Sequence, residues 1–121
     1  MSLFDKLLVA HLVGDWLLQT EWQALNKRQN YRALFSHIGI YSAIILGVLL
    51  LDFGLYNFSV YFVVGLLALA HALLDRGWPV IRYMKTFRLI NDRKPERWLV
   101  MAVDQSIHVL LIMLAVIVLT I

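Results

Sequence analysis

Residues 10–19 read AHLVGDWLLQ and place two polar side chains, His11 and Asp15, in an otherwise apolar run. Because they are four residues apart, the two side chains would lie on the same face of an α-helix, one turn from each other. Gln19 extends this polar stripe by one more turn. A polar stripe on an apolar helix is typical of a membrane-embedded bundle, in which the stripe faces the other helices.

The same spacing of histidine and aspartate occurs twice more in the chain. His71 and Asp75 form it in AHALLD at residues 70–75, and Asp104 and His108 form it in reverse order in DQSIH at residues 104–108. The fourth histidine, His37, lies in FSHIGIY at residues 35–41. Every histidine of the chain therefore belongs to one set, together with three of its eight acidic residues. We expect this set to form one shared site, made by His11, Asp15, His37, His71, Asp75, Asp104 and His108.

The composition indicates an integral membrane protein. Of the 121 residues, 61% are hydrophobic and 16% are charged, whereas soluble domains are roughly 45–50% apolar. The mean hydropathy is +0.74. The chain has no cysteine, so disulfides and thiolate metal sites are excluded, and any metal ligands must be imidazoles and carboxylates.

Four apolar segments predict an all-α, polytopic membrane protein: a four-transmembrane-helix bundle in a single domain covering residues 1–121. The expected spans are residues 3–20, 33–52, 59–76 and 98–120. The first is the weakest candidate, because it is short and polar on one face. At about 1.5 Å per residue, the other three approach the roughly 30 Å thickness of the hydrocarbon layer.

The basic residues predict the orientation. Lysine and arginine gather in the connectors at residues 21–32 and 76–97, whereas the loop at 52–59 contains neither. The positive-inside rule then places both basic connectors in the cytoplasm and both chain termini outside. The expected location is the bacterial inner membrane, with the lipid bilayer as partner. Topology accounts for the net charge of +3, so we expect no nucleic-acid partner.

The second basic connector contains Arg82, Lys85 and Arg88 at intervals of three residues, with Pro79 at its start. This pattern favours an interfacial amphipathic helix between the third and fourth spans, with its basic face toward anionic lipid headgroups. The alternative is an ordinary basic loop.

All seven residues of the expected site fall in the cytoplasmic half of this topology. Ionisable groups that face lipid are costly to insert, by about 2.5–3.5 kcal/mol for a charge at the helix centre, and a shared cation removes much of that cost. A histidine and aspartate set suits Zn²⁺, Mn²⁺ or Fe²⁺ without selecting among them. Seven candidates exceed the four ligands of a closed zinc site, which leaves room for a second metal, for carboxylates that orient the imidazoles, or for a general base. The alternatives are interhelical hydrogen bonds and a proton relay.

Smaller features of the sequence have weaker interpretations. Gly14 and Gly39 would let helices approach closely. Tyr41 and Gln105 are interpreted as polar groups that pack within the bundle, and Trp16 as part of an aromatic belt at the membrane interface.

The motifs HLVGDWLLQ, SH at residues 36–37, HALLD and DQSIH together resemble domain-of-unknown-function family 3307, a family of small bacterial and phage membrane proteins. The resemblance covers almost the whole chain, with Trp16 where phenylalanine is expected. The chain is also distantly similar to inner-membrane metal-dependent hydrolases. These resemblances imply that the same seven histidines and aspartates are the site residues and that they bind a divalent metal ion.

Three functions are compatible with the sequence. The first is a metal-dependent hydrolase acting on a lipid or lipid-linked substrate, with Asp15, Asp75 and Asp104 as the candidate catalytic carboxylates. The second is a structural or regulatory membrane protein stabilised by a metal ion, without catalysis. The third is a proton or divalent-cation pathway formed by a homo-oligomer.

Overall fold

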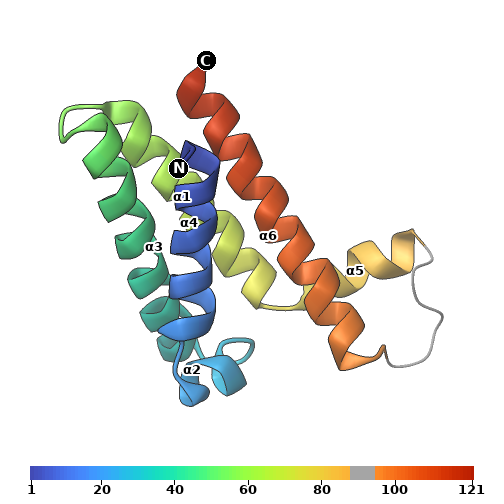
Figure 1. The fold of residues 1–121 in the computed structure, drawn as a ribbon. Coiled ribbons are helices and arrows are strands. Elements are labelled where there is room, and N and C mark those ends of the chain that lie inside the picture. The colour runs from blue at the N-terminus through green and yellow to red at the C-terminus, as the bar shows by residue number, and fades with distance from the viewer. Residues whose placement is uncertain (88–94) are drawn as a thin grey trace.

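The computed structural model describes residues 1–87 and 95–121, and within these ranges its regular structure is entirely helical (Figure 1). The predicted all-α class is therefore confirmed. Three helices are long: α3 (Tyr31–Phe53), α4 (Phe58–Asp75) and α6 (Arg97–Thr120). Three are shorter: α1 (Leu3–Leu12), α2 (Glu21–Asn26) and α5 (Trp78–Thr86). A π-helical turn, η1 (Val13–Leu17), continues α1 without a break.

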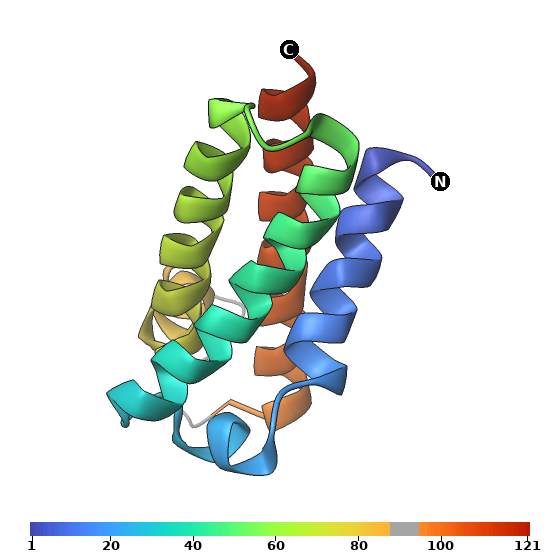
Figure 2. The ribbon, with the colours of Figure 1, turned by 90° about the vertical axis from the view of Figure 1, so that its left-hand side faces the viewer.

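The helices α1, α3, α4 and α6 run side by side as a bundle (Figures 1 and 2). Helix α1 packs against α3 and α6, and α4 packs against the same two helices. The α3–α4 loop and the two chain ends lie toward one end of the bundle, where Lys6 Nζ is 2.8 Å from Asp52 Oδ1. Helices α2 and α5 lie toward the other end, so the two basic connectors share one end of the molecule, as the predicted topology requires.

Three helices, α3, α4 and α6, are long and apolar enough to cross a membrane. Their bounds agree with the predicted spans within two residues. The four-span prediction is not confirmed, because the 10 residues of α1 and the 5 of η1 cover only about 22 Å at 1.5 Å per residue. The first segment also ends at Leu17, before the predicted residue 20.

The outer faces of the long helices are apolar. Leu69 on α4 is 60% exposed and Leu110 on α6 is 59% exposed. Other leucine, methionine and isoleucine side chains of these two helices are also exposed. An apolar surface of this extent on two long helices is what lipid would cover. The exposed faces therefore agree with membrane association.

Apolar and polar side chains occupy different halves of the bundle interior. The half near the α3–α4 loop is filled by an apolar core that includes Leu7, Ile45, Leu49, Val60 and Ile112. The buried polar and charged residues lie in the other half, toward α2 and α5. They are His11, Asp15, Gln23, His37, His71, Asp75 and His108.

The helix expected in the second basic connector is present as α5. Val80 and Met84 are buried against Val100 of α6, whereas Arg82 and Lys85 are exposed on the remaining surface. Its first turn contains a proline, as predicted. The third basic residue of the expected face, Arg88, lies outside the described residues.

Of the two glycines expected to permit close helix approach, only Gly14 does so. A Cβ atom at Gly14 would lie 2.9 Å from Tyr41 Cδ2 and 3.3 Å from Tyr41 Cα, so η1 and α3 are in close contact there. A Cβ atom at Gly39 would meet no described atom within 4 Å. The expectation for Gly39 is therefore wrong, because this residue faces away from the neighbouring helices.

Candidate metal centre

Four buried side chains from three elements converge in the polar half of the bundle. Asp15 comes from η1, His37 from α3, and His71 and Asp75 from α4. Each of the four residues is at most 4% exposed. One donor atom from each lies within 4.8 Å of the others. We call Asp15, His37, His71 and Asp75 the primary donor set.

The distances in the primary donor set are short and similar. Asp15 Oδ1 is 3.0 Å from His37 Nε2 and 3.3 Å from His71 Nε2. Asp75 Oδ2 is 3.1 Å and 3.0 Å from the same two nitrogens, and the two Nε2 atoms are 3.1 Å apart. Bonds of 2.0–2.2 Å to a tetrahedral ion would separate its ligands by roughly 3.3–3.6 Å. These five separations are therefore close to those between the ligands of one metal ion.

Hydrogen bonds alone do not account for this arrangement. Each imidazole Nε2 carries at most one hydrogen, so the two nitrogens can satisfy only two of the five close contacts with full hydrogen bonds. If both were protonated, the two N–H donors would lie side by side, with their nitrogens 3.1 Å apart. If either were unprotonated, its lone pair would face two carboxylate oxygens. A cation at the centre would instead accept a lone pair from each of the four donor atoms.

Asp15 lies in the π-helical turn, and its close partners come from other helices. In a regular α-helix, Asp15 would lie one turn from His11 on the same face. The i→i+5 hydrogen bonding of η1 widens the turn, and Asp15 Oδ2 is 3.8 Å from His11 Nε2, beyond hydrogen-bonding distance. The close partners of Asp15 are instead His37 and Gln105, from α3 and α6. Single π-helical turns within α-helices are frequent at functional sites.

Both ring nitrogens of His11 are engaged in hydrogen bonds. Its Nε2 lies 2.9 Å from Gln105 Oε1, an acceptor, so Nε2 carries the proton and donates it. Its Nδ1 lies 2.9 Å from the hydroxyl of Tyr41, which donates to it when the ring is neutral. His11 thus supports the site through α3 and α6, and it belongs to neither of the two potential metal-binding groups found in the described residues.

Gln105 links the acidic residues to these outer hydrogen bonds. The Trp16 indole N–H, which can only donate, lies 3.2 Å from Gln105 Oε1 and fixes the orientation of the amide. The amide nitrogen then donates to Asp15 Oδ2 at 2.9 Å and to Asp104 Oδ2 at 3.3 Å. One side chain therefore orients two carboxylates, in the way that outer-shell residues orient metal ligands.

A second group of potential ligands adjoins the first and shares Asp75. One donor atom each from Asp75, Asp104 and His108 lies within 4.8 Å of the others. His108 Nδ1 donates to the carbonyl oxygen of Asp104 at 2.7 Å, which leaves Nε2 with a free lone pair. Among the described residues this buried Nε2 has no hydrogen-bond partner. The Asp104 side chain is 20% exposed, unlike the carboxylates of the primary donor set.

Basic side chains of the connectors lie beside the site. Lys27 Nζ is 3.2 Å from Asp75 Oδ1. Arg28 packs over Gly77, where an added Cβ atom would be 2.9 Å from its Nε. Arg76, next in sequence to Asp75, has its guanidinium 4.7 Å from the centroid of the Tyr31 ring. The end of the site that faces α2 is therefore positively charged.

The structure brings six of the seven expected site residues into the two potential metal-binding groups and gives the seventh, His11, a supporting position. Sequence reasoning treated Gln105 and Tyr41 as packing groups and Lys27 only as a connector charge, although all three contact site residues. The one available signal was the position of Gln105 directly after Asp104, within the DQSIH motif. Lys27 gave no signal, because its contact depends on how α2 folds back.

Comparisons with known proteins identify a family and no function. The family model described as "Protein of unknown function (DUF3307)" matches residues 3–121. No curated protein and no solved structure matches the chain, so the expected similarity to metal-dependent hydrolases is not shown. The match covers nearly the whole chain and includes every residue of both potential metal-binding groups. The chain therefore belongs to the DUF3307 family.

Proposed function

We propose that this protein is an integral membrane protein that binds a divalent metal ion through the primary donor set. The observation that carries this proposal is the convergence of four donor atoms, among which the two imidazole Nε2 atoms face each other at 3.1 Å. Two imidazole nitrogens and two carboxylate oxygens suit Zn²⁺, which binds four such ligands tetrahedrally. Mn²⁺ or Fe²⁺ would bind with additional ligands.

Electrostatics supports the same proposal. Asp15 and Asp75 are buried among apolar helices, where unpaired carboxylates are strongly unfavourable. Lys27 pairs with Asp75, but the hydrogen-bond donors that reach Asp15 from Gln105 and the histidines need carry no charge. A divalent ion between the two carboxylates supplies the missing positive charge.

The location that we propose is the bacterial inner membrane, with the basic connectors in the cytoplasm and both chain ends outside. Its support is the gathering of basic residues at one end of the bundle. The metal site then lies in the cytoplasmic half of the membrane. Because the chain has no cysteine, single-cysteine variants can test this in intact cells. A membrane-impermeant maleimide should label Tyr56→Cys directly but Gln29→Cys only after permeabilisation, and the opposite pattern would reverse the orientation.

The reaction that we propose is hydrolysis of a lipid or lipid-linked phosphate. A divalent ion with an open coordination position would lower the pKa of a coordinated water and polarise a phosphoryl oxygen. Asp104 is partly exposed beside the primary donor set, where water or substrate could enter. Lys27, Arg28 and Arg76 provide positive charge for an anionic headgroup at the same end.

A structural role for the ion is the second candidate, favoured by the closed character of the primary donor set. Four buried protein ligands resemble a structural zinc site, which has no open position. In that case the ion stabilises the bundle and no substrate exists. A cation pathway is less well supported, because the other half of the bundle interior is filled by apolar side chains such as Leu49, Val60 and Ile112.

Metal content tests the binding proposal. Detergent-purified wild-type protein should carry bound divalent metal by elemental analysis, and Asp75→Asn should lose most of it. Asp52→Asn is the matched control, because Asp52 is an aspartate at the other end of the bundle, paired with Lys6. This control should retain its metal. Metal-free wild-type protein, or equal metal in all three, would refute the proposal.

Activity on a panel of phospholipids and lipid-linked phosphates tests the hydrolase proposal. Wild-type protein should release product, and Asp104→Asn should abolish release while the ion of the primary donor set stays bound. Ser106→Ala is the control, because the exposed Ser106 hydroxyl donates to the Ala102 carbonyl of its own helix. Bound metal without activity on any substrate, together with unfolding by chelator, would instead favour the structural role.

A further inference from the structure

We propose that Asp75, Asp104 and His108 form a second, exchangeable divalent-ion site that shares Asp75 with the first. This inference rests on the proposed metal binding and deepens it, since it predicts a pair of ions. We call these three residues the secondary donor set. It brings together residues from α4 and α6, so that a second ion would link α6 to the helices that carry the primary donor set.

The hydrogen bonding of His108 leaves its Nε2 available to a metal ion. Its Nδ1 donates to the Asp104 carbonyl at 2.7 Å, which fixes the tautomer and leaves the Nε2 lone pair free. A hydrogen bond from one ring nitrogen to a backbone carbonyl is the usual support of a metal-bound histidine. The side chain is 2% exposed, and Nε2 has no hydrogen-bond partner in residues 1–87 and 95–121. An unpartnered polar atom at such burial is unfavourable, and a cation would satisfy it.

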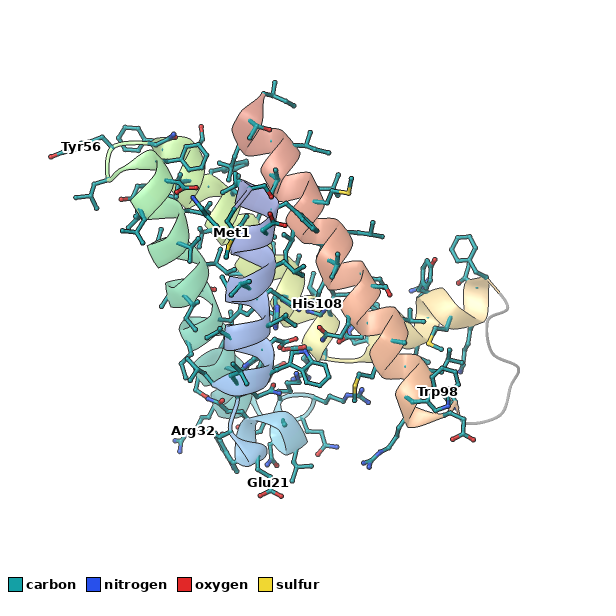
Figure 3. The ribbon with its side chains drawn as sticks, in the orientation of Figure 1. Met1, Glu21, Arg32, Tyr56, Trp98 and His108 are labelled. Atoms are coloured by element: carbon teal, nitrogen blue, oxygen red, sulfur yellow. The ribbon has the colours of Figure 1, made fainter. Side chains whose placement is uncertain are left out.

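His108 also faces the primary donor set. Its ring is 4.4 Å from the ring of His71 in a T-shaped contact and 5.4 Å from the ring of His11. Figure 3 shows the side chain pointing from α6 into the interior of the bundle. The two donor sets therefore adjoin each other inside the same buried region.

Asp75 has the geometry of a shared ligand. Its Oδ2 contacts His37 and His71 in the primary donor set, and the carboxylate as a whole contributes a donor atom to each set. In two-metal sites the ions are typically about 3.5–4 Å apart, a separation that a bridging carboxylate can span. Lys27, 3.2 Å from Asp75 Oδ1, is a long and partly exposed side chain that can turn away when an ion arrives.

Charge balance predicts that the second ion binds more weakly than the first. Asp15, Asp75 and Asp104 together carry three negative charges, which one divalent ion and Lys27 already neutralise. A second ion adds positive charge, so its binding favours an accompanying anion such as a phosphate group. With three protein ligands and a partly exposed Asp104, this ion would also have open coordination positions. It is therefore the ion that an anionic substrate would reach.

The number of divalent ions per chain tests this inference. Purified protein is equilibrated with increasing concentrations of Mn²⁺, and total bound divalent metal is then measured by elemental analysis. The wild type should rise from one ion to two, and the second should be lost on dialysis. Asp104→Asn should stay at one ion, and Asp52→Asn should behave as the wild type.

Each outcome separates this inference from the metal-binding proposal. If the wild type stays at one ion at saturating Mn²⁺, the second site is overturned and the first is unaffected. The same conclusion follows if the Asp104→Asn variant also binds two ions. A wild type without any bound metal refutes both. Should Asp104→Asn fail to fold, as judged by gel filtration, His108→Asn provides the same test. In wild-type protein stripped of metal and reloaded with two equivalents of Mn²⁺, we expect a magnetically coupled Mn²⁺ pair in the electron paramagnetic resonance spectrum. Isolated Mn²⁺ signals from that sample would contradict the shared Asp75.

Discussion

Gln105 shows how much of the site depends on one uncharged side chain. Its amide nitrogen donates to Asp15 and Asp104, and its amide oxygen accepts from His11 and Trp16. All four contacts are consistent with a single orientation of the amide. Through them Gln105 couples α6 to α1 and η1 and holds the carboxylate of Asp15 toward the primary donor set.

Gln105→Leu should weaken metal binding without unfolding the protein. Loss of an outer-shell hydrogen bond to a metal ligand typically lowers metal affinity about 10–100-fold, and leucine fills a similar volume. The measurement is a competition titration of the purified protein with a chromophoric chelator. Ser106→Ala, the exposed neighbour on the same helix, should bind metal as the wild type does. Unchanged affinity in Gln105→Leu would show that Asp15 needs no such support.

The spacing of histidine and aspartate identified the residues that cluster, because three i, i+4 pairs and one further histidine are an unusual pattern in an apolar chain. The spacing could not assign their roles. His11 has the same pattern as His71, yet its two ring nitrogens are engaged by Tyr41 and Gln105. The π-helical turn that contains Asp15 was not predicted either, because nothing in the local sequence indicates it.

Among the elements, the contact between η1 and α3 decides the position of Asp15. Gly14 lies directly before Asp15, and its lack of a side chain lets η1 approach the buried Tyr41. Any Cβ atom at this position would press on the aromatic ring and on the backbone of α3. A larger residue there would therefore move Asp15 away from His37.

Gly14→Ala should destabilise the protein and Gly39→Ala should not. Overpacking a close contact typically costs about 1–3 kcal/mol, whereas alanine in place of an unobstructed helical glycine stabilises by roughly 0.5–1 kcal/mol. Thermal unfolding of the two purified variants against wild type provides the measurement. Since both changes add one methyl group to a helix, similar melting temperatures for the two variants would contradict the contact.

The apolar runs predicted the three long helices within two residues, because length and hydropathy suffice for elements of this kind. They did not predict the short first segment correctly. Its polar stripe extends to Gln19, but the helix ends at Leu17, and the Thr20 side chain then caps α2 together with Gln23. Helix α2 has only six residues. In so short a segment of a polar connector, the capping residues alone were too weak a pattern to predict a helix.

At the scale of the whole molecule, the proposed ion joins three elements that are far apart in sequence. Asp15 contributes from η1, His37 from α3, and His71 and Asp75 from α4. The apolar core holds the opposite half of the bundle. The polar half is held by the hydrogen bonds of Gln105 and His11 and, in our proposal, by the ion.

Chelation should therefore lower the thermal stability of the wild type. A ligand that binds only the folded state stabilises it by about 2.7 kcal/mol at a free concentration 100 times its Kd. Adding metal should raise the melting temperature of the wild type and of Asp52→Asn, and a chelator should lower both. Asp75→Asn should respond to neither addition. A wild-type melting temperature that ignores both metal and chelator would argue against an ion that links the three elements.

The overall arrangement followed from the order of apolar segments and basic connectors. The alternation of apolar segments predicted that the two basic connectors would lie at one end, and α2 and α5 do lie there (Figure 1). The charges predicted which end is cytoplasmic, and that remains a prediction. The contact between Lys27 and Asp75 could not be predicted from the sequence, because it depends on the path of the chain between α2 and α3.

X-ray absorption spectroscopy at the zinc edge, on purified wild-type protein carrying one equivalent of Zn²⁺, tests the central claim most directly. We predict four nitrogen and oxygen neighbours at about 2.0–2.2 Å, with the outer-shell scattering of two imidazole rings. A six-coordinate shell of oxygen atoms without imidazole, or zinc that does not remain bound to the protein, would contradict a metal centre made by Asp15, His37, His71 and Asp75.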